Sequence, residues 1–338
     1  MMYISEVIVS AMISFVWAFL LSLLLLYVHI KLAWRRQILA EDAHKTPKPL
    51  VANLGGIVLY SIPVLALPLL STAGEKVYLA LVLSTVIGLT IGLIDDMRDL
   101  GLIKALFVAL AGLPIILFEV YIPKPYIPMI GNVRMTLLYP LVVLAFFSIF
   151  ADACNMIDIF NGVLVGQALA VLLPLMLFAI LVGAKVPLIL IAIGLGYVLA
   201  FLYWNRYPAK VFHANVGAYG LGSLLSAIII LSAATGLTGA EFVAIIGFLP
   251  AVYNGFVYVF STRFAPRARL SREKKAVLFI NGRLEANKDP NAALNLTRLL
   301  TIKGGLTEKQ LIVLYYLMFL SSGLLATLTS LLIHAGLI

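Results

Sequence analysis

Cysteine, histidine and charged residues are all scarce in this chain of 338 residues. Cys154 is the only cysteine, which excludes an intramolecular disulfide framework and the usual zinc sites built from several cysteines. Charged residues make up 12% of the sequence, with only 15 acidic side chains, whereas hydrophobic residues make up 63%. A mean hydropathy of +1.09 excludes an ordinary soluble domain and predicts a polytopic membrane protein.

Long polar stretches are also missing, so we treat residues 1–338 as a single integral membrane domain. Runs of about 20 apolar residues, the length of a helix that crosses a bilayer, predict an all-α fold with ten transmembrane helices. The runs centre near residues 7–30, 53–71, 77–94, 104–120, 137–153, 163–182, 187–204, 217–235, 241–262 and 311–335. The first run is too long for a signal-peptide core and precedes its basic residues, so we expect no cleavable signal.

Basic residues are distributed unevenly between alternate loops. The loops at 31–52, 95–104, 205–216 and 263–310 carry 20 of the 24 Lys and Arg residues. Because basic loops remain in the cytoplasm, we expect these loops there and both termini outside. The net charge of +9 then marks the cytoplasmic face, so no nucleic-acid partner is expected. Residues 121–135, with prolines and a Gly-Asn pair, are expected outside as a loop that can contain a short hairpin.

Two adjacent carboxylates, Asp95 and Asp96, end the apolar run that begins near residue 77. Ionised acids are costly at a membrane boundary, because low dielectric disfavours their charge. A single acid at such a position is more often a solvated helix end. Two of them, in a chain with so few acids and with Lys104 nearby, indicate a functional site.

The predicted topology brings the other polar motifs to the same face. They are Lys48 and Asn53 in and after the first of these loops, Asn155, Asp158 and Asn161 between the fifth and sixth spans, Phe212 and Asn215 before the eighth, and Arg267 and Arg269 in the loop at 263–310. A topology shifted by one span would scatter them over both faces. Their convergence is therefore the main argument from the residues for a single cytoplasmic site.

The chemistry of these groups favours a metal-assisted nucleotide site. Asn155 and Asp158 are three residues apart, so they share one face of a helix end. Carboxylate and amide oxygens suit Mg²⁺, or Mn²⁺, better than zinc. Oxygen ligands ringed by basic side chains are typical of a nucleoside diphosphate site, where Phe212 would offer a stacking face. Each group taken alone has a structural explanation, such as helix capping or contact with lipid headgroups.

At these residues the chain resembles the polyprenyl-phosphate N-acetylhexosamine-1-phosphate transferases, over essentially its whole length. Asp95-Asp96 is similar to the paired aspartates of that family, followed by the basic Lys104. Residues 155–162 resemble its Asn-x-x-Asn-x-x-Asp-Gly motif, and residues 212–215 resemble Phe-x-Gly-Asp. Residues 266–269, Pro-Arg-Ala-Arg, resemble the Pro-Arg-His-Arg of the eukaryotic dolichyl-phosphate enzyme and its archaeal relatives.

The resemblance implies a membrane transferase that moves N-acetylglucosamine 1-phosphate from UDP-N-acetylglucosamine to a dolichyl or other polyprenyl phosphate and releases UMP. It assigns a catalytic role to Asp95, Asp96 and Lys104, a Mg²⁺ site to Asp158 and Asn215, and nucleotide contacts to Asn155, Asn161 and Phe212. Arg267 and Arg269, in the long loop 263–310, would bind the diphosphate and sugar, with Lys48 and Asn53 as further candidates. Such a step would begin glycan assembly, of the N-glycan or cell-surface type, at the cell membrane. Another UDP-N-acetylhexosamine and a homodimer remain open.

The sequence departs from the family pattern in an informative way. Where the family usually has Asn and Asp, this chain has Asp158 and Asn215. If both face one metal ion, this reciprocal exchange preserves one carboxylate and one amide. Leu164 replaces the second Asp of a bacterial motif, unless Asn161 takes its place, and Ala268 replaces a His. The histidine-rich last-loop motif of the bacterial muramoyl-pentapeptide enzyme is absent, which argues against peptidoglycan synthesis.

Two other classes of function fit parts of the pattern. A secondary transporter also has half-buried acids and glycine-broken helices, but it predicts acids along a translocation path. Glu119 and Asp152 are the only other acids in or beside the spans, and both lie near span ends. A non-catalytic scaffold would not need both Asp95 and Asp96. The gathering of polar groups at one face therefore favours an enzyme.

Overall fold

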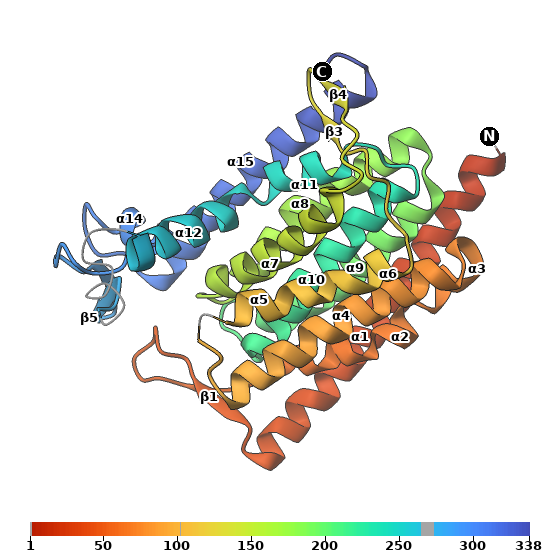
Figure 1. Cartoon of the computed structure of the whole chain (residues 1–338). Coiled ribbons are helices and arrows are strands. Elements are labelled where there is room, and N and C mark those ends of the chain that lie inside the picture. The colour runs from red at the N-terminus through yellow and green to blue at the C-terminus, as the bar shows by residue number, and fades with distance from the viewer. Residues whose placement is uncertain (1, 102, 265–273) are drawn as a thin grey trace.

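The computed structural model describes residues 2–101, 103–264 and 274–338 and is mostly helical (Figure 1). Eight of the described helices are long and apolar enough to cross a membrane, and a bent helix pair makes a ninth if it counts as one span. The prediction of a helical polytopic membrane protein is therefore confirmed. The expectation of ten spans stays a prediction, because its fourth span corresponds to a shorter apolar helical stretch, Lys104–Leu117.

Seven of the eight candidate spans are single helices, and one is a segment of three short ones. The eight candidate spans are α1 (Met2–Arg36), the segment of η1 (Gly55–Ser61), α2 (Ile62–Leu65) and α3 (Leu67–Ala73), α4 (Glu75–Met97), α7 (Tyr139–Ile157), α8 (Val163–Val182), α9 (Lys185–Asn205), α10 (Ala214–Ala234) and α15 (Glu308–His334). The bent pair is α11 (Ala240–Gly247) and α12 (Leu249–Val259) with the π-helical turn η3 (Phe260–Phe264), at 66° to each other. The shorter helices are α5 (Lys104–Ala109), η2 (Leu110–Gly112), α6 (Leu113–Leu117) and α14 (Leu296–Leu300).

Helix α10 forms the centre of the bundle, where it packs against α4, α7 and α9. Every residue from 216 to 232 is buried. Glycines allow this close approach: a Cβ on Gly222 would lie 2.5 Å from the Cα of Ala151 in α7, and one on Gly217 would lie 2.8 Å from the Cα of Gly56. Gly217, Gly220 and Gly222 therefore form a packing surface of α10.

The two ends of the bundle have different contents. Figure 1 shows both termini near the end of the bundle that carries the hairpin of β3 (Tyr126–Ile127) and β4 (Gly131–Asn132). The hairpin expected within residues 121–135 is confirmed, although its turn is formed by residues 128–130 and the Gly-Asn pair lies in β4. The strand pair β1 (Leu39–Glu41) and β2 (Leu50–Ala52) lies at the opposite end, where α4 and α7 end and α10 begins.

The described part of the long last loop is folded. Strands β5 (Val277–Ile280) and β6 (Arg283–Ala286) pair in register, with Ile280 opposite Arg283. Asn281 and Gly282 close the turn with positive φ values of 49° and 78°, the conformation of a two-residue hairpin turn. The Arg298 guanidinium in α14 then donates hydrogen bonds to four backbone carbonyls of residues 287–293, which holds the loop to α14.

Candidate active site

A cavity of about 430 Å³ lies where α7 and α9 end and α10 begins. The residues that line it include six of the predicted site residues: Asn53, Asn155, Asp158, Asn161, Phe212 and Asn215. They come from the turn after β2, the end of α7 with the turn that follows it, and the start of α10. The structure therefore brings these separate motifs together at one cavity, as their loop positions predicted.

The remaining predicted residues fall into three groups. Asp95, Asp96 and Lys104 stand beside the cavity and connect to it through Asn215. Lys48 is exposed, with its Nζ 3.6 Å from Glu41, and is not among the lining residues. Arg267 and Arg269 lie outside the described residues, so their assignment to the diphosphate and sugar stays a prediction.

The paired aspartates at the end of α4 make different contacts. The buried Asp95 carboxylate accepts hydrogen bonds from Lys104 Nζ at 3.1 Å and from Asn215 Nδ2 at 2.9 Å. The exposed Asp96 carboxylate accepts the backbone N–H groups of Asn215 and Val216 at 3.0 and 2.8 Å. Asp96 therefore caps the N-terminus of α10, and Asp95 joins the basic side chain of Lys104 to the cavity residue Asn215.

The donor set at the cavity fits a hard divalent cation. Asn215 uses its Nδ2 toward Asp95, and among the described residues no group donates to its Oδ1. Asp158, which follows the last residue of α7, has as its only described ion-pair neighbour His213 Nδ1, at 3.5 Å. An amide oxygen and a carboxylate without strong protein partners line the same cavity, which is the oxygen chemistry that Mg²⁺ or Mn²⁺ takes.

Asn161 is held by protein contacts on both ends of its amide. Its Oδ1 accepts hydrogen bonds from Ala209 N at 2.8 Å and from Lys45 Nζ at 3.1 Å, and its Nδ2 donates to Asp42 at 3.4 Å. The residue is 5% exposed. These contacts fix the turn after α7 at the cavity wall. The contact of Asn161 with a nucleotide stays a prediction.

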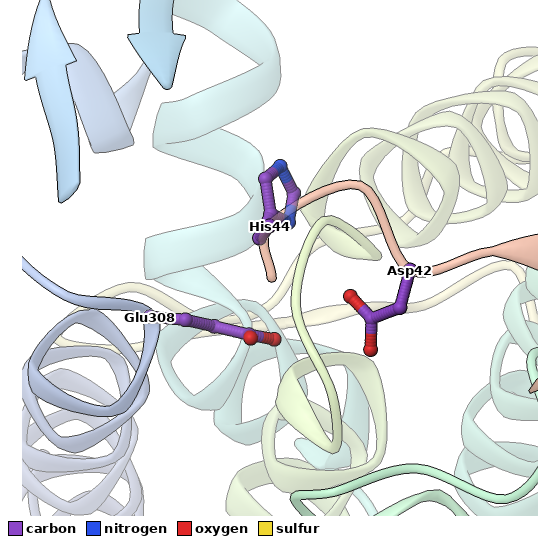
Figure 2. A group of neighbouring side chains, drawn as sticks. All are labelled: Asp42, His44 and Glu308. Atoms are coloured by element: carbon purple, nitrogen blue, oxygen red, sulfur yellow. The ribbon is translucent and has the colours of Figure 1, made fainter. Parts of the chain in front are cut away.

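A second cluster, formed by Asp42, His44 and Glu308, shares this wall, because Asp42 and His44 also line the cavity. Figure 2 shows the carboxylates of Asp42 and Glu308 pointing toward one another. The ligand atoms of the three residues lie within 4.8 Å of one another. However, the Lys45 ammonium pairs with both carboxylates, at 2.9 Å from Glu308. Because an internal cation already pairs with both acids, the cluster fits an ion-paired contact between the first loop and α15 better than a metal site.

Burial and ion pairing shift the titration of the two bases in this cluster. Burial lowers the pKa of Lys45, but its hydrogen bonds to Asp42 and Glu308 outweigh that effect, so the pKa lies above its usual value. Burial also lowers the pKa of His44, which packs at 4.9 Å against the ring of Phe160, and the Asp42 charge only partly opposes this. Lys45 therefore stays protonated, whereas the folded protein favours the neutral form of His44.

Several polar residues around the cavity were not predicted as site residues. His213 is fully buried, stacks on Phe201 with ring centroids 3.6 Å apart, and faces Asp158. Tyr219 joins Asp152 to Asn155, and Asn205 ties Gly162 to Val211. Asp152 lies three residues before Asn155, a helical spacing that the sequence displays. Nothing local in the sequence marks Tyr219 or His213, because their partners are distant in the chain.

Comparisons with known proteins show what this chain is similar to. The family model described as glycosyl transferase family 4 matches residues 78–233, which include Asp95, Asp158 and Asn215. A protein of Sulfolobus acidocaldarius, provisionally named as a UDP-N-acetylglucosamine–dolichyl-phosphate N-acetylglucosaminephosphotransferase, is 32% identical over 251 residues, which cover 70% of this chain and 73% of that protein. A protein of Saccharolobus solfataricus with the same provisional name is 28% identical over 299 residues, 85% of this chain and 86% of that one.

More distant similarity reaches a bacterial enzyme. A phospho-N-acetylmuramoyl-pentapeptide-transferase of Lacticaseibacillus paracasei is 31% identical over 106 residues, which cover 31% of this chain and 33% of that protein. The two archaeal relatives match over most of both chains, and this bacterial one over about a third. The comparisons therefore favour the archaeal type of relative.

Proposed function

Because the chain belongs to glycosyl transferase family 4, we propose that it transfers N-acetylglucosamine 1-phosphate from UDP-N-acetylglucosamine to a dolichyl or similar polyprenyl phosphate, with release of UMP. The observation that carries this proposal is the cavity that gathers Asn155, Asp158 and Asn215 beside the Asp95–Lys104 pair. Its volume of about 430 Å³ lies within the range of small-molecule sites.

The residues at the cavity suit a diphosphate bound with a divalent cation. Asp158 and Asn215 Oδ1 would hold Mg²⁺, which when bound neutralises phosphate charge and stabilises the developing negative charge on the departing phosphate. The Lys104 ammonium adds positive charge at the same end of the bundle. Phe212 is fixed at both backbone groups, since its N–H donates to Ala52 and its carbonyl accepts from Gly55. It lines the cavity, where its ring would offer a face to the base.

The reaction breaks a phosphoanhydride bond and leaves the glycosidic bond intact. An oxygen of the acceptor phosphate attacks the sugar-linked phosphorus in line, and the bond from that phosphorus to the bridging oxygen breaks, so UMP departs with the bridging oxygen. The second pKa of a phosphate monoester is about 6, so the acceptor is largely ionised at neutral pH. Asp95 therefore serves to hold Lys104 and Asn215 in place, and little proton removal is required.

The orientation of the site follows from charge and belongs to this proposal. The basic loops that the structure describes lie at the cavity end of the bundle, and basic loops usually remain in the cytoplasm, which supports a cavity that opens at the cytoplasmic face of the cell membrane. A UDP-sugar is then taken from the cytoplasm and the lipid acceptor from the bilayer beside the site. The product, a lipid-linked sugar diphosphate, would begin the assembly of a glycan, and protein glycosylation is one use of such a glycan.

Lipid-extractable label tests the activity. The purified protein is incubated with UDP-N-acetylglucosamine or UDP-N-acetylgalactosamine carrying tritium in the sugar, together with polyprenyl phosphate and Mg²⁺. We expect label in the organic phase from UDP-N-acetylglucosamine, only in the presence of polyprenyl phosphate, and its loss when the metal is chelated. A secondary transporter would instead accumulate intact UDP-sugar in proteoliposomes, without labelled lipid.

A further inference from the structure

Asp152 and Tyr219 form a hydrogen-bonded chain that ends on a cavity residue. Tyr219, fully buried in α10, donates its hydroxyl proton to Asp152 Oδ1 at 2.9 Å. The Nδ2 of Asn155 donates to the same hydroxyl oxygen at 3.2 Å. Asp152 and Asn155 lie three residues apart on one face of α7, so the tyrosine bridges them from the neighbouring helix.

The direction of these hydrogen bonds is set by the carboxylate. An ionised carboxylate only accepts, so the single proton of the Tyr219 hydroxyl is committed to Asp152. The tyrosine oxygen can then only accept from Asn155, which turns the NH₂ group of that amide toward Tyr219. Among the described residues no group donates to Asn155 Oδ1, and Asn155 lines the cavity, so its carbonyl oxygen is the end left for a ligand.

We propose that Asp152 is a positioning residue which, through Tyr219, holds the amide of Asn155 with its oxygen toward the cavity. The group that meets Asn155 is then a hydrogen-bond donor or a metal cation, and phosphate oxygens are excluded from this position. The inference rests on the proposed function for the identity of the ligand, a uridine nucleotide with its cation. The relay itself rests only on the contacts among the three side chains.

The chain contains a matched tyrosine–carboxylate pair that lies away from the proposed active-site cavity. Tyr139, at the other end of α7 and 1% exposed, donates to Glu241 Oε1 at 2.7 Å. Neither residue lines the cavity. Removal of the Tyr139 hydroxyl therefore measures what the loss of a buried tyrosine–carboxylate bond does to this fold, without any effect through Asn155.

A double-mutant cycle tests the relay. Asp152→Asn supplies an amide that can donate to Tyr219, which frees the tyrosine proton for Asn155 and removes the preference for one orientation. We expect Asp152→Asn and Tyr219→Phe each to raise the Kd of UMP with Mg²⁺ about tenfold, equivalent to about 1.4 kcal/mol, in calorimetric titrations. In an Asn155→Ala background the same changes should alter the Kd less than twofold, because the group they position is absent.

The control variant and a second measurement separate the possible failures. Tyr139→Phe should lower the thermal midpoint of unfolding but leave the UMP Kd unchanged. Equal weakening by Asp152→Asn with and without Asn155 would overturn the relay. If the wild-type protein binds no UMP, the proposed function is wrong, and the relay is then judged on the ligand-free protein. There, non-additive shifts of the thermal midpoint for Asp152→Asn and Asn155→Ala support it, and additive shifts refute it.

Discussion

The Asp96 carboxylate, at the end of α4, accepts a hydrogen bond from the backbone N–H of Asn215, in the first turn of α10, at 3.0 Å. The same carboxylate accepts the next N–H, that of Val216, at 2.8 Å. Helix N-termini leave such N–H groups without partners in their own helix, so a side chain 119 residues away supplies the cap. This contact fixes the start of α10, and with it the side chain of Asn215 beside Asp95.

The two adjacent aspartates should therefore fail in different ways. Asp96→Ala removes the cap of α10 and should cost about 1 kcal/mol of stability. Asp95→Ala releases Lys104 and the Asn215 amide from their shared partner. At equal concentrations of folded protein, it should therefore lower the transfer rate more than Asp96→Ala does. Thermal unfolding in detergent and initial rates of the purified variants measure the two effects. Identical losses of stability and rate in both variants would contradict this division of roles.

Ala214 is a site of backbone strain that a single substitution should relieve. It begins α10 with φ = +56°, a left-handed conformation, at the position where the family motif Phe-x-Gly-Asp has glycine. Glycine adopts this conformation without a Cβ clash, so Ala214→Gly should stabilise the protein by about 1 kcal/mol. Ala218→Gly, inside the same helix, is the control and should destabilise it. A lower thermal midpoint for both variants would show that the strain is not real.

Lys45 should be one of the few surface-loop residues whose loss unfolds the site. Its side chain is 14% exposed and pairs with Asp42 and Glu308, each 3% exposed. Lys45→Met leaves two buried carboxylates without a cation and should cost about 3 kcal/mol. Lys48→Met in the same loop is the matched control, because its pair with Glu41 is exposed and should be worth less than about 1 kcal/mol. Equal effects of the two substitutions on the thermal midpoint would contradict the role of the cluster.

Neutral His44 should make stability sensitive to mild acid. Burial holds its pKa below the usual 6.5 in the folded protein, so the unfolded chain binds a proton more readily. Neutral His44 contributes its full share to the free energy of unfolding above pH 6.5, the usual pKa of the unfolded side chain. This contribution is lost as the pH falls through the lower pKa of the folded protein. The thermal midpoint of His44→Gln should therefore fall less between pH 7 and pH 5 than that of the wild type. A steeper fall in the variant would reverse the sign of this linkage.

The sequence predicts the spans and the meeting of the motifs because both depend on simple patterns. Apolar runs locate both ends of α4 and α7 to within about four residues, and loop parity alone brings Asp158 and Asn215 to the same end of the bundle. The comparisons confirm the resemblance to the sugar-phosphate transferases. Asn281-Gly282 between two short apolar stretches and the Thr307-x-x-Gln310 capping box of α15 were also local signals in the sequence, although our predictions did not use them.

Other features depend on contacts between distant residues, so they could not be read from local patterns. The fourth expected span is divided among α5, η2 and α6, which together make a shorter stretch that packs against α4 and α7. Asn161, predicted as a nucleotide ligand, has its amide engaged by Lys45, Asp42 and the backbone of Ala209. The different contacts of Asp95 and Asp96 likewise follow from how α10 approaches α4.

The fate of the β-phosphate tests the central claim most directly. With UDP-N-acetylglucosamine carrying ³²P at the sugar-linked phosphorus, polyprenyl phosphate and Mg²⁺, the wild-type protein should move ³²P into the lipid phase together with the sugar. Asp158→Asn should lower the rate by orders of magnitude, since loss of a metal ligand costs several kcal/mol in the transition state. The double variant Asp158→Asn/Asn215→Asp, which restores one carboxylate and one amide, should recover much of it. Sugar in the lipid phase with ³²P left in the aqueous phase would contradict sugar-phosphate transfer. If the rate loss of the double variant equals the two single losses multiplied together, the shared metal site is contradicted.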